Sequence, residues 1–378
     1  MDLDFTSEQN MLRDSAAKFF AGECTFEEVK KIEETEQGYS TELWRKVADL
    51  GWTGLLFPSS YGGYDGTFMD LVILQEEMGK AVFPSPFFST VIQCGLLILE
   101  GGSEEQKQSL LSQISEGSLI MALAQYEEET DYSAGSVSMQ AEPKGDRYVL
   151  NGTKLFVMDA NIADKLIVVA RTGNASISLL LVDAHDPGVK ITKMPTVALD
   201  NTCEVIFKDV TVSKEDLIGP PGGGEALLEK MYAKATVAKV AEMVGGCRIC
   251  IDMTAAYAKS REQYGNPIGG YQAIQHFMAN MLLAYDTSSN YLYGVTRMIE
   301  EGEDFSRDAS ALKAHANESF RYITERAVKI HGGIGTTREA DVALFYRRAH
   351  PFSLMCGSSE YHYERIAETL LTEGLEAF

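Results

Sequence analysis

The sequence predicts a multi-layer α+β protein with a helical N-terminal domain, a middle β-sheet domain and a C-terminal helical bundle. Helix caps mark the first part, short β-branched runs mark the second, and long apolar stripes at helical spacing mark the third. With 378 residues, 45% of them hydrophobic, the chain can bury more than one core. We therefore expect domains over residues 1–117, 118–224 and 225–378.

Helical signals dominate the N-terminal part. Thr6 and Gln9 fit a capping box, in which each side chain bonds the backbone N–H of the other residue. The glycines and the single proline of residues 51–63 predict an irregular loop. Helical spacing then resumes over residues 70–78 and 104–114.

The middle part changes to short apolar runs separated by turn residues. Asn151-Gly152 and Gly173-Asn174 are typical of tight turns. The runs that we expect to be strands are Leu119–Leu123, Tyr148–Leu150, Leu155–Val157, Leu166–Val169 and Ile177–Val182. Pro220-Pro-Gly-Gly-Gly224 then marks the return to helix.

Helical periodicity is strongest in the C-terminal part. One stripe consists of Ile274, Phe277, Met278, Met281, Leu282 and Tyr285, and the next of Leu312, Ala316, Ile323, Ala327 and Ile330. Long helices with such stripes pack into bundles.

Composition narrows the class of protein. A formal charge of −22 argues against binding to nucleic acid or to an anionic membrane, because such surfaces attract clusters of Lys and Arg. The acidic N-terminus and the absence of a long apolar run predict a cytoplasmic protein. We expect the six cysteines to be free thiols, with Cys247 and Cys250 on one helix face rather than in a metal site.

Two C-terminal segments together predict a nucleotide site. Arg261 begins Arg-Glu-Gln-Tyr-Gly, and Gln272 follows eleven residues later; an Arg before a helix offers a fixed fork of donors to a pyrophosphate. His331-Gly-Gly-Ile-Gly335 would let backbone approach phosphate or adenine closely. The alternative is that each segment merely ends a helix.

This order of motifs resembles the acyl-CoA dehydrogenase family. The resemblance extends over nearly the whole chain, from Phe5-Thr-Ser-Glu-Gln9 through Pro58–Gly63 and Asn151-Gly-Thr-Lys154 to the glycine motif. It implies a barrel-like middle domain and a C-terminal four-helix bundle. Within the family the chain looks most like the small subunits of two-component enzymes such as pimeloyl-CoA dehydrogenase. This likeness to the small subunits rests on three segments, Leu123–Gln125, Ile218–Gly224 and Leu354–Gly357.

The resemblance implies FAD as cofactor, with its adenosine diphosphate part held across a dimer interface. The residues that match this role are Arg261, Tyr264, Gln272, Lys329, Gly332, Gly333 and Gly335, where Tyr264 replaces the usual Phe and Lys329 the usual Gln. These positions would therefore serve the flavin of a neighbouring chain.

The resemblance also shows what is missing. The family's Glu base precedes a Gly, but Cys356 stands there, and the alternative Glu position on the first bundle helix is Ala235. The flavin and CoA loop is replaced by Tyr126–Ser133, which has four acids and no glycine. Phe156-Val-Met158 replaces Trp-Ile-Thr, and Thr236 replaces the Arg that meets CoA.

Three hypotheses follow. The first is a subunit of a hetero-oligomeric FAD-dependent acyl-CoA dehydrogenase, such as a heterotetramer, paired with a larger paralogous chain that carries the base; an acyl-CoA thioester as substrate and an electron-transferring flavoprotein as partner are implied. The second is a self-sufficient enzyme for an unusual acyl-CoA, with Tyr126, Glu127 or Asp131 as a relocated base. The third is a non-enzymatic scaffold.

Overall fold

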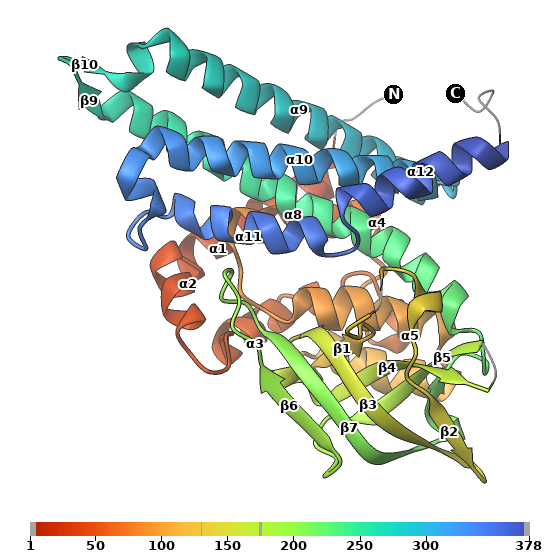
Figure 1. Ribbon diagram of the computed structural model, residues 1–378. Helices are drawn as coiled ribbons and strands as arrows, with labels where there is room; N and C mark the ends of the chain where they lie inside the picture. Colours follow the sequence, from red (N-terminus) through yellow and green to blue (C-terminus); the bar gives the residue numbers. More distant parts are fainter. Residues whose placement is uncertain (1–4, 130, 174–175, 374–378) are drawn as a thin grey trace. The chain divides into compact units, whose positions relative to one another are not determined.

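The computed structural model describes residues 5–129, 131–173 and 176–373 (Figure 1). The chain divides into two compact units. Unit 1 consists of Met1–Val29, Phe68–Phe83 and Thr236–Phe378, and unit 2 of Lys30–Thr67 and Pro84–Ala235. Each unit therefore combines segments that are far apart in the sequence. The domain limits 1–117, 118–224 and 225–378 stay a prediction.

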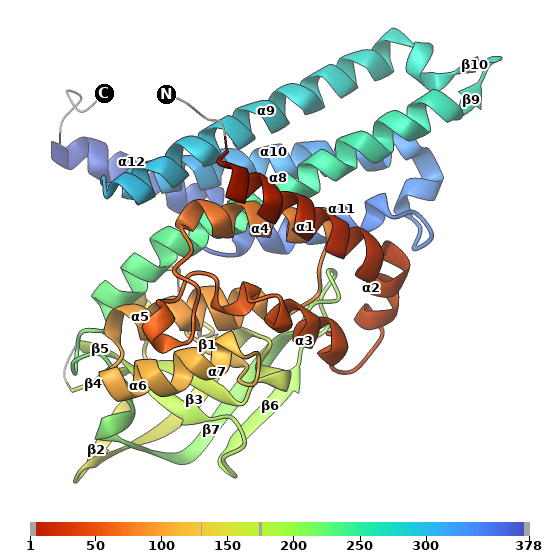
Figure 2. The same cartoon turned by 180° about the vertical axis from the view of Figure 1, so that it is seen from behind.

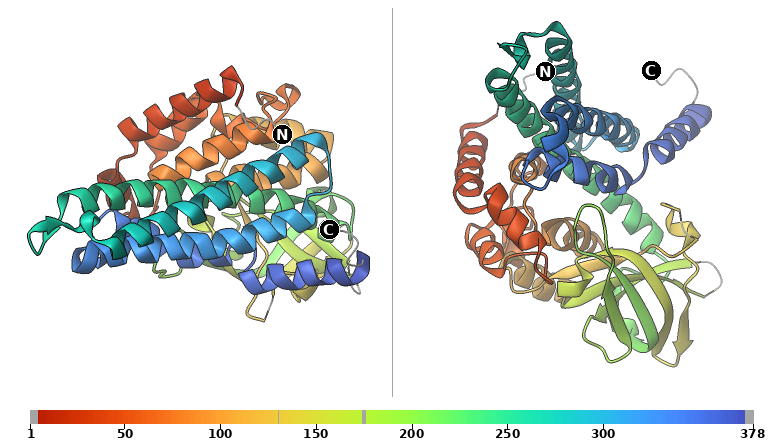
Figure 3. Two further views of the ribbon diagram at one scale, coloured as in Figure 1. Left: turned by 90° about the horizontal axis from the view of Figure 1, so that it is seen from above. Right: turned by 60° about the vertical axis from the view of Figure 1, so that its left-hand side comes forward.

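Unit 1 is helical, and the predicted C-terminal bundle is confirmed. Its helices are α1 (Ser7–Glu23), α4 (Phe68–Ala81), most of α8 (Gly224–Ser260), α9 (Gln272–Glu301), α10 (Ser306–His331), α11 (Val342–Leu354) and α12 (Ser359–Glu373), with α2 (Phe26–Glu33) beginning in this unit. Helices α8, α9 and α10 run alongside one another (Figures 1 and 3). Among the described residues, no helix is long and apolar enough to cross a membrane.

Local predictions in unit 1 hold with one refinement. The capping box of Thr6 and Gln9 is present, since each side chain bonds the backbone N–H of the other. The predicted stripe lies on α9 and buries Met281, but Leu282 of the same stripe is 42% exposed. The apolar spacing therefore predicts the helix correctly and overstates how much of its face is buried.

Helices α4 and α8 approach each other through two glycines. A Cβ at Gly79 would lie 2.0 Å from the backbone oxygen of Glu242, and one at Gly245 would lie 2.0 Å from that of Glu76. Tyr293 on α9 donates a hydrogen bond to the Glu76 carboxylate. An N-terminal helix is thus fixed inside the C-terminal bundle by contacts that any larger side chain would break.

Unit 2 contains the predicted β-domain, which is confirmed as two four-stranded sheets (Figure 2). The first has the order β1 (Met121–Ala124), β4 (Lys165–Thr172), β5 (Ser176–Asp183), β8 (Leu217–Ile218), and the second β2 (Ala141–Lys144), β3 (Arg147–Met158), β7 (Thr202–Ser213), β6 (Val189–Lys193). Strand β1 is parallel to β4, and the other pairs are antiparallel.

Unit 2 also contains several helices. They are α3 (Thr41–Asp49), α5 (Gly95–Gly101), α6 (Glu104–Gln106) and α7 (Ser112–Ser115), with π-helical turns at Phe88–Cys94 and Lys107–Leu111. The hydroxyl of Thr90 both donates to the Met121 carbonyl and accepts its N–H, each at 3.0 Å. The first π-turn thereby fixes the start of β1.

One predicted turn is wrong. Asn151-Gly152 lies inside β3, so the runs 148–150 and 155–157 form one strand. Strand β7 continues past this point, and the Asn151 side chain accepts the Asp209 N–H at 2.8 Å where the register shifts. The register places Lys208 and Asp209 opposite Asn151 alone, so the bulge lies on β7 and the Asn-Gly pair stays within β3, because pairing with a long neighbouring strand overrides the local turn preference. Gly173 has a left-handed backbone, and Asn174 lies outside the described residues.

Candidate functional site

Arg261, Tyr264 and Gln272 surround a short hairpin in unit 1, formed by β9 (Glu262–Gln263) and β10 (Asn266–Pro267). Arg261 is the first residue after α8 and is exposed. Tyr264 forms the turn with a left-handed backbone (φ 54°) and is 94% exposed. Gln272 begins α9 and is also exposed. All three side chains are accessible to a ligand.

Lys329 and the glycine turn lie at the end of α10. The Lys329 ammonium lies 5.4 Å from the centroid of the Phe277 ring on α9. Gly332 has φ 71° and ψ −148°, a conformation that strongly favours glycine. A Cβ at Gly332 or Gly333 would meet no atom within 4 Å, whereas Gly335 packs under the last turn of α10. The first two glycines therefore offer open backbone.

The structure brings these two sets of residues to one end of unit 1 (Figure 1). Tyr257, on the last turn of α8, stacks on His331 at the end of α10, with ring centroids 4.4 Å apart. The Arg261 and Lys329 side chains are both exposed and cationic, and the backbone of Gly332 and Gly333 is open. Their chemistry fits the diphosphate and adenosine of a dinucleotide.

Neither predicted base position carries a base. Cys356 lies in the turn between α11 and α12 and is buried. Burial raises the pKa of its thiol to about 11, although the Lys313 and Lys239 ammonium groups oppose the rise. The thiol is therefore protonated near neutral pH. Ala235 is fully buried and has no ionisable group.

The Cys356 turn is held by a buried lysine that the sequence analysis missed. Lys313 is fully buried on α10 and donates to the Asn317 amide oxygen at 2.5 Å, the Phe352 carbonyl at 3.0 Å and the Gly357 carbonyl at 3.3 Å. Burial lowers the pKa of Lys313 to about 7. Its ammonium thus ties the end of α11 to the residue after Cys356. No sequence signal separates such a lysine from the many that face solvent.

The Cys247-x-x-Cys250 pair lies on α8. Both thiols are free and buried, and burial raises both pKa values. Within the described ranges, no group of three or more His, Cys, Asp or Glu side chains is arranged to hold a metal ion.

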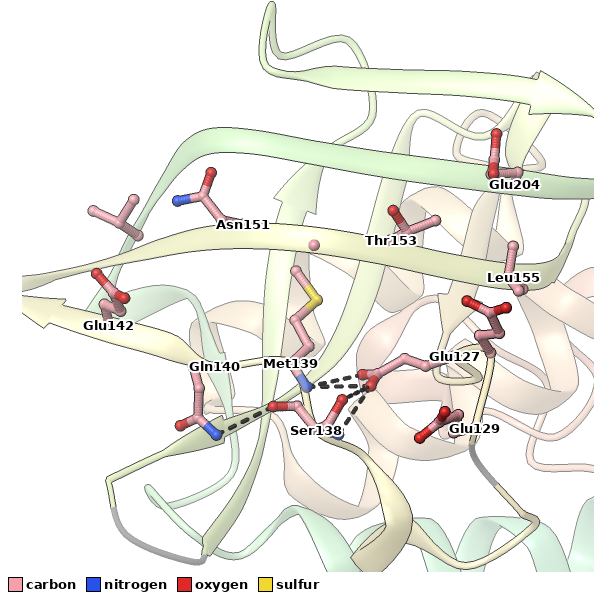
Figure 4. Close-up of a pocket in the computed structure, with 13 residues that line it drawn as sticks. Glu127, Glu129, Ser138, Met139, Gln140, Glu142, Asn151, Thr153, Leu155 and Glu204 are labelled. Atoms are coloured by element: carbon pink, nitrogen blue, oxygen red, sulfur yellow. Dashed lines mark hydrogen bonds between the residues drawn. The ribbon is translucent and has the colours of Figure 1, made fainter.

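In unit 2, several hydrogen-bond donors converge on the Glu127 carboxylate (Figure 4). It accepts the Ser138 N–H at 2.9 Å, the Ser138 hydroxyl, the Met139 N–H at 3.1 Å and the Lys154 ammonium at 2.6 Å. Lys154 is fully buried and also donates to the Gln125 carbonyl at 2.9 Å. Burial alone would raise the pKa of Glu127, but the bonds from Lys154 and Ser138 outweigh it and lower the pKa. We call this arrangement the Glu127 clamp.

The other two proposed bases also have polar neighbours. The Tyr126 hydroxyl lies 3.4 Å from that of Tyr232, and the Asp131 carboxylate accepts the Ser133 N–H at 2.7 Å. Neither the Tyr232 hydroxyl nor the Ser133 N–H is a base that could accept a proton from these side chains. The structure therefore distinguishes none of the three as a poised base.

A groove of about 870 Å³ runs beside the Glu127 clamp (Figure 4). Its acidic lining consists of Glu127, Glu128, Glu129, Glu142 and Glu204. Carboxylates at this density repel a phosphate, and the clamp already uses the backbone donors of Ser138 and Met139. This loop therefore does not fit the phosphates of a coenzyme.

The remaining substituted positions agree with this result. Phe156 has a left-handed backbone (φ 55°) and is 56% exposed, and Thr236 is buried. Neither side chain brings a charge.

Family models of the acyl-CoA dehydrogenase N-terminal, middle and C-terminal domains match residues 6–118, 122–210 and 222–371. Together these matches cover most of the chain. The chain therefore belongs to the acyl-CoA dehydrogenase family, whose members are flavin oxidoreductases.

Individual relatives agree over almost their whole length. The acryloyl-CoA reductase (NADH) of Anaerotignum propionicum is 29% identical, with 98% of this chain and 96% of the relative covered. The caffeyl-CoA reductase–Etf complex subunit CarC of Acetobacterium woodii is 30% identical, with 97% and 99% covered. The solved butyryl-CoA dehydrogenase of Megasphaera elsdenii is 26% identical with a TM-score of 0.91, and 98% of this chain and all of that chain are covered.

Proposed function

We propose that the chain is the catalytically depleted subunit of a hetero-oligomeric, FAD-dependent acyl-CoA dehydrogenase. A larger paralogous subunit supplies the base, the flavin-ring loop and the CoA contacts. This chain supplies Arg261, Tyr264, Gln272, Lys329 and the glycine turn for the adenosine diphosphate part of its partner's FAD. When bound, FAD accepts the hydride that leaves the acyl-CoA thioester.

The observation that carries the proposal is the contrast between two sets of residues. The proposed nucleotide-binding residues other than Gly335 are exposed, and Gly332 and Gly333 are sterically open, whereas Cys356 is a buried, protonated thiol and Ala235 cannot titrate. Removal of an α-proton needs a base whose pKa lies near the working pH. A chain that serves its partner's cofactor and does no proton chemistry itself would have this pattern.

The relocated-base hypothesis has less support. Glu127 is one of its three candidate bases, and the Glu127 clamp gives this carboxylate four donors and a lowered pKa. Such a carboxylate is a weak base that would have to break its bond to Lys154 before it could take a proton. The scaffold hypothesis does not account for the open nucleotide-binding end.

Finer features belong to the same proposal. A pimeloyl-CoA dehydrogenase-type small subunit, a heterotetramer, a cytoplasmic location and electron transfer to an electron-transferring flavoprotein are all proposed. One relative is named as a subunit of a complex with Etf, which supports a multi-subunit arrangement here. The acyl-CoA would come from the breakdown of fatty or aromatic acids.

The test is the visible absorbance spectrum of the chain, purified alone and after co-expression with a paralogous subunit that carries the Glu base. We expect a colourless chain alone, and about one flavin per pair of chains in the complex, bleached by added acyl-CoA. Full flavin occupancy and bleaching of the isolated chain would refute the proposal in favour of a relocated base. A complex that binds no flavin would favour the scaffold.

A further inference from the structure

Tyr257 makes two contacts with one residue of another helix. Its ring stacks on the His331 imidazole with centroids 4.4 Å apart and planes 24° from parallel. Its hydroxyl donates to the His331 carbonyl at 3.3 Å. The His331 Nδ1 lies 2.7 Å from the Ala327 carbonyl and donates to it, so the imidazole is also fixed by its own helix. The end of α8 is thereby joined to the end of α10.

On the α8 side, this contact determines where Arg261 lies. The Arg261 N–H donates to the Tyr257 carbonyl at 2.8 Å, as the last such bond of the helix. The Arg261 carbonyl in turn accepts the Ile268 N–H at 2.8 Å, which closes the hairpin. The backbone of Arg261 therefore moves with Tyr257.

On the α10 side, the same contact determines where the glycine turn lies. Gly332 follows His331 directly and leaves the helix with φ 71°. A Cβ at Gly335 would lie 2.9 Å from the His331 Cβ, so the turn folds back onto this residue. A shift of the His331 ring would displace the open backbone of Gly332 and Gly333.

We infer that Tyr257 is a positioning residue, which holds Arg261 and the glycine turn at the spacing that one dinucleotide requires. The inference rests on the proposed function and adds to it the residue that preorganises the site. Two segments that must grip one rigid diphosphate bind it more weakly when their spacing fluctuates, because the cost of ordering them falls on the binding step. Tyr257 itself needs no contact with FAD.

The experiment measures the dissociation constant of FAD by flavin fluorescence, in the complex of this chain with its paralogous subunit after FAD has been removed. We expect Tyr257→Leu to weaken FAD binding about tenfold, as the stack and the hydrogen bond are lost. Tyr257→Phe keeps the stack and should weaken binding roughly threefold. Tyr291→Phe is the matched control, because Tyr291 also donates one hydrogen bond within the bundle, to Asp308, and should leave binding unchanged.

A double-mutant cycle with Arg261→Gln separates positioning from a general loss of stability. If Tyr257 acts by placing Arg261, then Tyr257→Leu should weaken binding much less in the Arg261→Gln background than in the native chain. Equal effects in both backgrounds would overturn the inference. So would unchanged FAD binding in Tyr257→Leu with its native circular dichroism spectrum. If Tyr257→Leu does not fold, the same cycle with Tyr257→Phe decides.

The outcomes also separate this inference from the proposed function. A native complex without FAD, or unchanged binding in Arg261→Gln, would contradict the proposed nucleotide site itself. Weakened binding in Arg261→Gln together with native binding in both Tyr257 variants would overturn only the role of Tyr257.

Discussion

Glu127→Gln tests the Glu127 clamp directly. The substitution keeps the shape of the side chain and removes the carboxylate that neutralises Lys154. The Lys154 ammonium is fully buried, so in the variant it keeps neutral acceptors such as the Gln125 carbonyl, 2.9 Å away. Breaking a buried ion pair by removing one partner typically costs about 3–5 kcal/mol, because the remaining charge is uncompensated.

The cost should depend on pH in a defined direction. Burial already holds the pKa of Lys154 at about 8, below its unfolded value. A lysine whose folded pKa is depressed opposes folding below that pKa, and the penalty is relieved as pH rises through it. Without Glu127, the pKa of Lys154 in the folded variant falls below its value in the folded native chain. At a pH between these two pKa values, Lys154 is protonated in the native chain and neutral in the variant. The deficit of the variant therefore shrinks by about 1.4 kcal/mol per pH unit as pH rises towards 8.

The expected deficit in the free energy of unfolding is about 3 kcal/mol at pH 6, if the pKa falls by about two units, and about 1 kcal/mol or less at pH 8. Urea unfolding followed by tryptophan fluorescence measures it, since Trp44 and Trp52 are both buried in unit 2 with Lys154. Glu42→Gln is the control, because its partner Lys46 is 38% exposed and the pair should show no pH slope. A deficit that stays constant from pH 6 to 8 would refute this account of Lys154.

Three further predictions concern the helical bundle and the buried thiols. Gly245→Ala should lower the free energy of unfolding by about 3 kcal/mol, because its Cβ would overlap α4, whereas Gly294→Ala, on an open face of α9, should raise it by about 1 kcal/mol; thermal unfolding compares the two. Lys313→Met should lower the free energy of unfolding, measured in urea, by about 3 kcal/mol, because it leaves buried carbonyls unpaired. A decrease of less than about 1 kcal/mol would contradict the role of Lys313. Cys356 and the other buried thiols should resist Ellman's reagent at pH 8 in the native chain and all react after unfolding; rapid native labelling of Cys356 would show that it is ionised or accessible.

Local patterns predicted the elements that depend on neighbours in sequence. The capping box at Thr6 and the helix α9 follow from spacings of three and four residues, and the structure contains both. Asn151-Gly152 failed as a turn because its conformation is set by the register with β7, whose residues lie more than fifty positions away. A short-range signal cannot report that competition.

The contacts that organise the candidate site were beyond sequence reasoning for the same reason. Glu127 was recognised only as one acid among several, because nothing in its surroundings reveals that Lys154 lies beneath it. Tyr257 and His331 are 74 residues apart and meet only once α8 and α10 pack. The sequence shows that Cys356 and Ala235 stand where the family carries its Glu base. The structure adds that burial raises the pKa of the Cys356 thiol and keeps it protonated.

The divided composition of unit 1 affects how the chain can fold during synthesis. Its first segment ends at Val29 and its last begins at Thr236, so α1 leaves the ribosome some two hundred residues before most of its unit exists. At about 5–20 residues per second, α4, which packs against α1, waits on the order of ten to forty seconds for its partner α9. Unit 2 is complete at Ala235 and can fold during that wait. A nascent chain stalled after Ala235 should therefore present a folded β-domain together with the helix pair α1 and α4, which still lacks most of α8 and all of α9 and is open to chaperones.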